Sequence, residues 1–146
     1  MPLTTCEFDH LNRISLIRVR GSLADESLAG LYDACNKYST DTDASVSIVD
    51  LSSVSEFSLS CESIRRLADR IPVKGDASRR CFIVAPEGHV YGLSRMFQLL
   101  GEVRRPLLQI VHTLGEALVA IGIPSPHFAP SVLARFGTVP PVHVTA

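Results

Sequence analysis

Apolar residues recur along the chain with two different spacings. Short runs rich in β-branched residues indicate buried strands, whereas apolar residues at i, i+3, i+4 and i+7 indicate amphipathic helices. The strand-like runs are residues 3–8, 14–19, 46–51, 81–85 and 107–111. The helical stripes are residues 28–35, 64–71, 90–100 and 114–121.

Helix start and stop signals flank these stripes. Ser22, Ser60 and Thr113 stand where N-caps are expected, and Thr113 begins a capping box that ends at Glu116. The third helix is expected to begin near His89. Pro72, Gly101 and Gly122 are typical of helix ends, because proline cannot continue a helix and glycine favours the left-handed C-terminal conformation.

The order of the elements predicts the fold class. A first hairpin is followed by helices that alternate with strands, and parallel neighbours need such crossover connections. We therefore expect an α/β fold with a mixed, mostly parallel sheet of about five strands and helices packed against it. A chain of 146 residues is long enough for one self-sufficient core.

Composition and charge narrow the function classes. The chain is 46% hydrophobic and 20% charged with a net charge of −1, which excludes a disordered chain and gives no attraction to nucleic acid or anionic membranes. No apolar run approaches the roughly 20 residues of a membrane span. The first ten residues carry Glu7 and Asp9 and no basic region, so no secretory signal is predicted.

The four cysteines are widely scattered. Cys6, Cys35, Cys61 and Cys81 form no C-x-x-C pair, so we expect reduced thiols, a cytoplasmic protein, no metal site and no cofactor. Three arginine pairs also occur, at 65–66, 79–80 and 104–105. They lack interleaved aromatic residues, so a nucleic-acid surface is not predicted.

The C-terminal segment differs from the rest. We place a domain at residues 1–123 and an extension at residues 124–146, which is proline-rich, apolar and nearly uncharged. A disordered tail would be more polar, so we expect the extension to dock on its own domain or on a second subunit. Pro130 suits the first turn of a short helix.

Polar residues gather at one predicted sheet edge. Asp50, His89 and His112 follow parallel strands, and Cys61 is expected nearby. Ligands of open α/β sheets bind at this edge. One alternative is a hydrolase-like enzyme in which Cys61 or Ser60 is the nucleophile, His89 the base and Asp50 its orienting group. No G-x-S-x-G elbow is present, so we favour binding over catalysis and assign no catalytic residue.

Two stretches carry a resemblance to a known family. Residues 49–57, VDLSSVSEF, are similar to a strand ending in Asp-Leu and followed by a serine-containing loop. Residues 80–86, RCFIVAP, with residues 91–97, YGLSRMF, resemble the pattern of a strand, Ala-Pro and Gly-Leu-x-Arg-Met. Together they resemble the STAS fold of anti-sigma factor antagonists, in particular the SpoIIAA-like branch. The likeness covers about residues 12–122.

The resemblance implies a regulatory module. Such proteins bind a kinase or anti-sigma partner and are switched by phosphorylation of a serine or threonine that opens the second helix. Without gaps, the family's Asp-Ser pair falls on Ser58 and Leu59, so the phosphorylated position is apolar here. We take Ser58 and Ser60 as the candidate switch. A small-molecule or lipid-binding protein that uses the space between sheet and helices is a second alternative, and a homodimer through a helix face or the tail stays open.

Overall fold

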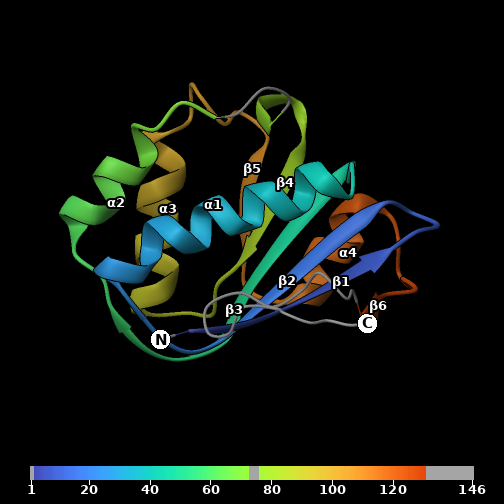
Figure 1. Ribbon diagram of the computed structural model, residues 1–146, viewed down its shortest axis with the longest axis horizontal. Helices are drawn as coiled ribbons and strands as arrows, with labels where there is room; N and C mark the ends of the chain where they lie inside the picture. Colours follow the sequence, from blue (N-terminus) through green and yellow to red (C-terminus); the bar gives the residue numbers. More distant parts are fainter. Residues whose placement is uncertain (1, 73–75, 131–146) are drawn as a thin grey trace.

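A six-stranded sheet forms the centre of the computed structural model, which describes residues 2–72 and 76–130 (Figure 1). The strand order across the sheet is β5-β4-β3-β2-β1-β6. The strands are β1 (Leu3–Asp9), β2 (Ile14–Ala24), β3 (Val46–Ser58), β4 (Arg80–Val84), β5 (Leu108–Val111) and β6 (Ala129–Pro130).

The pairing of the strands confirms the predicted class. β1 and β2 form an antiparallel hairpin, and β2, β3, β4 and β5 are parallel neighbours. The sixth strand was not predicted. Its two residues pair antiparallel with Glu7 and Phe8 at the outer edge of β1, so Pro130 lies in a strand and not in the first turn of a helix. Residues 131–146, the rest of the predicted extension, lie outside the described residues.

Four α-helices cover the two faces of the sheet unequally. They are α1 (Asp25–Asp41), α2 (Cys61–Ala68), α3 (His89–Leu100) and α4 (Leu114–Ile121). α1, α2 and α3 lie on one face and α4 lies on the other (Figure 1). None of the described helices combines the length and the apolar character that crossing a bilayer requires.

Strand residues form a buried core on both faces of the sheet. On the α4 face, Ile14, Leu16, Ile48, Phe82 and Val84 keep only 0–1% of their surface exposed. On the α1–α3 face, the strand residues Cys6, Ile17 and Val19 are equally buried, and four core residues of the helices keep 7–9%: Leu28, Leu67, Leu93 and Phe97. The strands are therefore shielded from solvent on both sides.

Three element boundaries differ from the sequence prediction. α2 ends at Ala68, so Ile71, which was expected in its apolar stripe, lies beyond the helix and is 82% exposed. Ser22 does not cap α1, because β2 continues to Ala24, whose amide hydrogen bonds the Ser27 hydroxyl at 3.3 Å. β3 likewise runs on to Ser58 through a stretch expected to be a serine-rich loop. The cause is tertiary: β2 and β3 pair along their whole length, up to Ala24 opposite Ser58, and this pairing overrides the local turn preference of serine.

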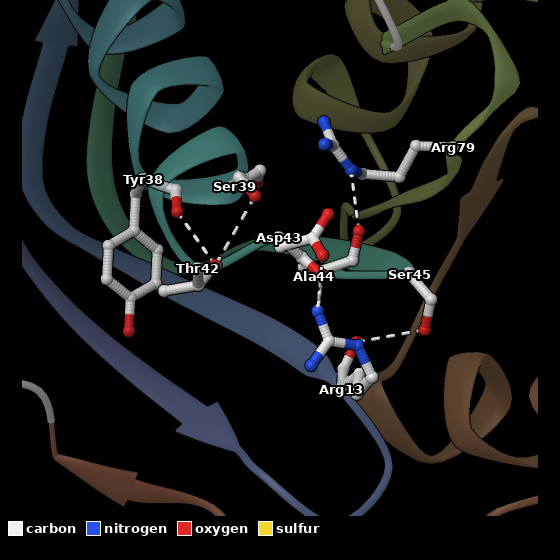
Figure 2. Close-up of polar contacts among 8 residues, drawn as sticks. All are labelled: Arg13, Tyr38, Ser39, Thr42, Asp43, Ala44, Ser45 and Arg79. Carbon is white, nitrogen blue, oxygen red and sulfur yellow. Dashed lines mark hydrogen bonds and ion pairs between the residues drawn. The ribbon is translucent and has the colours of Figure 1, made fainter.

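Hydrogen bonds to the backbone close the amino-end edge of the sheet (Figure 2). Arg13 has a left-handed conformation with φ of 59°, and its carbonyl accepts from the Ser45 amide at 2.9 Å. Its guanidinium pairs with Asp43 at 2.9 Å. Arg79 donates to the Ala44 carbonyl at 2.8 Å. The hairpin turn, the end of α1 and the start of β4 are thereby joined.

Candidate functional site

Ser60 is the N-cap of α2 and links this helix to α1. Its hydroxyl accepts a hydrogen bond from the Ser63 amide at 3.1 Å, as predicted for a cap. Its own amide donates to the Asp25 carboxylate at 2.8 Å. Asp25 is the first residue of α1. The starts of two helices therefore meet at one exposed serine.

The electrostatics of this junction depend on Asp25. Hydrogen bonds from the backbone and the side chain of Ser60, with further help from Ser63 and the positive charge of Arg66, lower the pKa of the Asp25 carboxyl. Each helix contributes a partial positive charge at its N-terminus, which also favours an anion there. Asp25 is therefore a carboxylate at neutral pH and occupies the position that an added phosphate would approach.

Both sequence neighbours of Leu59, Ser58 and Ser60, are exposed. Ser58 is the exposed last residue of β3, and Cys61 is the exposed first residue of α2. Leu59 packs against the core cluster under α2. The position on which the family's phosphorylated residue falls without gaps is thus part of the core, and Ser58 and Ser60 are the hydroxyls on either side of it. Their role as a switch stays a prediction.

Asp50 lies on the opposite face of the sheet. It shares the strand face of Ile48, which packs beneath α4. Its buried carboxylate accepts from the Ser52 amide at 2.9 Å and from the Ser52 hydroxyl at 2.6 Å. Arg18 lies 3.7 Å from the other carboxylate oxygen and pairs with Glu7 at 3.0 Å. Asp50 is therefore held in a line of charges across β3, β2 and β1.

His112 belongs to a third cluster, at the ends of β4 and β5. Its ring stacks on Tyr91 with centroids 4.3 Å apart and planes 15° apart. Its Nε2 lies 3.2 Å from the Glu87 carboxylate and its Nδ1 lies 3.8 Å from that of Glu116. The Glu116 carboxylate also accepts a hydrogen bond from the His112 amide at 2.7 Å. A capping box would use the amide of Thr113, the next residue.

The structure does not assemble these residues into a catalytic group. Within residues 2–72 and 76–130, no hydrogen bond, ion pair or ring contact joins any two of Asp50, Cys61, His89 and His112, and the Ser60 hydroxyl contacts Ser63 and not an imidazole. His89 is exposed at the start of α3. The same described ranges contain no group of three side chains suited to a metal ion.

The buried thiols are unsuited to nucleophilic chemistry. Burial, together with the neighbouring Glu7 charge, raises the pKa of the Cys6 thiol to about 12. Burial also raises the pKa of the Cys35 thiol well above its usual range. Because only the thiolate is a good nucleophile, neither residue serves a hydrolase-like reaction at neutral pH.

Sequence reasoning missed Asp25 as part of the site. The reason is that nothing in the spacing of the sequence shows that two helix starts 35 residues apart come together. The Tyr91–His112 stack was missed for the same reason. The local sequence signal for this junction is that Asp25, an acidic residue, begins α1 directly after the end of β2.

Comparison with known proteins agrees with the architecture. No protein-family model matches the sequence, and no curated protein matches it significantly. The crystal structure of an anti-sigma factor antagonist from Mycobacterium paratuberculosis is similar, with a TM-score of 0.54 and 25% identity over 82% of this chain and 94% of that one. The resemblance seen in the sequence is thereby confirmed in three dimensions: the chain has the mixed α/β fold of a STAS-type anti-sigma factor antagonist.

Proposed function

We propose that this chain is a non-enzymatic regulatory module that binds a protein partner at the junction of α1 and α2. The observation that carries the proposal is the similarity to an anti-sigma factor antagonist over 94% of that protein's chain. The partner is a kinase or an anti-sigma-like protein, and Ser60 is the residue whose phosphorylation switches binding. Ser58 is the second candidate.

The contacts of Ser60 support a switch at this residue. A phosphoserine adds about −1.5 to −2 charges. The start of α2 would attract this charge, but the Asp25 carboxylate already accepts the Ser60 amide there. Two anions at one helix start repel each other, so phosphorylation would displace Asp25 and separate the starts of α1 and α2. The surface around Ser60 would change in both charge and shape.

Ser58 would act differently. It is exposed at the end of β3, opposite Ala24, and lies outside the cap of α2. A phosphate on Ser58 would add charge to the surface without displacing the Asp25 carboxylate from Ser60. Ser60 is therefore the stronger candidate, because only its modification breaks an existing contact between two helices.

The test is a quantitative pull-down of the tagged protein from its own cells, with mass spectrometry of the partners and of the phosphorylated residues. We expect the wild type to enrich a kinase or sigma-regulatory protein. Ser60→Glu should change that enrichment by about tenfold, which corresponds to about 1.4 kcal/mol. Ser60→Ala should bind but fail to respond to the kinase.

Thr113→Ala is the matched control. It removes an equivalent N-cap from α4, on the other face of the sheet, so it should lower stability without changing the partners recovered. If all four proteins recover the same partners in the same amounts, Ser60 is not a switch. If the wild type recovers no regulatory protein, the proposed function is wrong.

A further inference from the structure

A cavity of about 160 Å³ lies between the sheet and helices α1, α2 and α3. Its walls are mainly apolar, and they include Leu28, Leu51, Leu59, Leu67, Leu93 and Phe97. For scale, an engineered apolar cavity of about 150 Å³ in another protein stays dry and binds benzene. The cavity is therefore large enough for a small organic molecule and too apolar to be filled well by water.

The cavity arises from small side chains at central positions. Cys35, Ser39, Ser47, Cys81 and Ser94 all line it. Protein interiors are normally packed as densely as organic crystals, with few voids larger than a water molecule. A cavity of this size on the α1–α3 side is therefore a departure from ordinary core packing.

The charged side chains that line the cavity, among the described residues, are both positive. They are Arg79 and Arg105, and no Asp or Glu accompanies them in the described part of the wall. Arg105 is held by neutral groups: it donates to the Tyr32 hydroxyl at 3.0 Å and to the Ala68 and Arg70 carbonyls at 3.1 and 2.9 Å. Its guanidinium also lies 5.0 Å from the centre of the Phe97 ring.

We propose that this cavity binds a small apolar molecule with an anionic end, of the medium-chain carboxylic acid class. The hydrocarbon part lies among the leucine side chains, and the carboxylate lies toward Arg105. The sign of the charge selects an acid over an amine, because a cationic end would meet the Arg105 guanidinium, whose described hydrogen-bond partners are all neutral. The inference does not depend on the proposed partner switch.

Titration calorimetry with octanoate, octanol and octylamine tests the proposal on the whole chain. We expect saturable binding of octanoate, weaker binding of octanol and the weakest binding of octylamine. Arg105→Gln should weaken octanoate by about tenfold while leaving octanol within about twofold. The ratio of the two affinities is the readout, because a purely structural loss would weaken both ligands alike.

Cavity-filling variants give the second arm. Cys35→Leu adds two side-chain heavy atoms inside the cavity and should abolish octanoate binding, whereas Ser94→Val adds one and should weaken it; both should raise the melting temperature. Val119→Leu adds the same kind of atoms on the exposed side of α4, where Val119 is 76% exposed, and should change neither. Ser94→Val is the smaller change and decides the question if Cys35→Leu does not fold.

Three outcomes would overturn the proposal. They are an absence of saturable octanoate binding to the wild type, unchanged octanoate binding in a folded cavity-filling variant, and octylamine binding as tightly as octanoate. Because none of these measurements involves a protein partner or phosphate, failure here leaves the proposed regulatory function untouched, and failure of the pull-down leaves the ligand site untouched.

Discussion

The two faces of the sheet are built from the same strands, but the cavity of about 160 Å³ lies on the side of α1, α2 and α3. Strand residues reach 0–1% exposure on both faces, as Leu16 and Phe82 do beneath α4 and as Ile17 and Val19 do on the side of α1. Neighbouring residues of β3 show the contrast, since Ile48 lies in the closed core and Val49 lines the cavity. The amount of helix on a face therefore does not decide how well it is packed.

Side-chain size explains the difference. The α4 face presents Phe82, Ile48 and Leu16, while the cavity side combines large residues such as Val49 and Ile83 with several cysteines and serines. Small side chains leave space that a rigid helix backbone cannot move in to fill. The comparison suggests a division of roles in which the α4 face stabilises the fold and the α1–α3 face, which also carries Ser60, provides the binding surfaces.

The largest expected effect is the loss of unfolding free energy in a matched pair of leucine-to-alanine variants. Leu16→Ala removes three carbon atoms from a fully buried side chain on the α4 face and should cost about 4–5 kcal/mol, near the top of the range for buried leucines. Leu51→Ala enlarges a cavity that already exists and should cost about 2–3 kcal/mol. Urea unfolding of both variants measures the difference. Equal losses would show that the two faces are packed alike.

The next prediction concerns the closure of the α4 face by residues 123–130. Asp9 is fully buried and accepts the His127 amide at 2.9 Å. Burial alone would raise the pKa of its carboxyl, but hydrogen bonds from Asn12, His127 and Leu11 lower it overall. The folded pKa therefore lies below the unfolded one, so Asp9 contributes stability above about pH 4 that is lost as the pH falls through the folded pKa.

Asp9→Asn should accordingly lower the free energy of unfolding by about 1.5–3 kcal/mol at pH 7, with the gap to the wild type closing as the pH falls below about 4. Thermal unfolding of both proteins as a function of pH measures this difference in stability. The control is Glu7→Gln, on the same strand as Asp9, which removes a partly exposed ion pair between Glu7 and Arg18. It should lower the free energy of unfolding by less than about 1 kcal/mol. A gap that stays constant with pH would contradict the role given to Asp9.

The smallest expected effect is the loss of unfolding free energy when one helix N-cap is removed on each face of the sheet. Ser60→Ala and Thr113→Ala each remove a hydroxyl that accepts from an amide three residues later at 3.1 Å. Each should cost about 1 kcal/mol, because a cap acts on its own helix whatever lies beneath it. Chemical denaturation of both variants tests this. A much larger loss for Ser60→Ala would mean that the contact of the Ser60 hydroxyl with Asp25 also stabilises the fold, because alanine keeps the amide that donates to Asp25.

Sequence patterns predicted the fold more completely than the site. Alternating strands and helical stripes give the order of elements, and Ser60 and Thr113 were identified as caps because a cap depends on residues close in sequence. The extension of β2 and β3 was missed because it depends on the pairing of Ala24 with Ser58. The cavity was invisible because periodicity shows which face of a helix is apolar and not whether the volume beneath it is filled.

The hydrogen bond between Asp9 and His127 also bears on the order in which the molecule is completed. The two residues are 118 positions apart, so a ribosome adding roughly 5–20 residues per second finishes the second about 6–24 seconds after the first. Until then the outer edge of β1 has no β6 beside it, and an open strand edge can pair with another chain. The edge of β1 at Glu7 and Phe8 therefore stays open in nascent copies until residues 127–130 emerge.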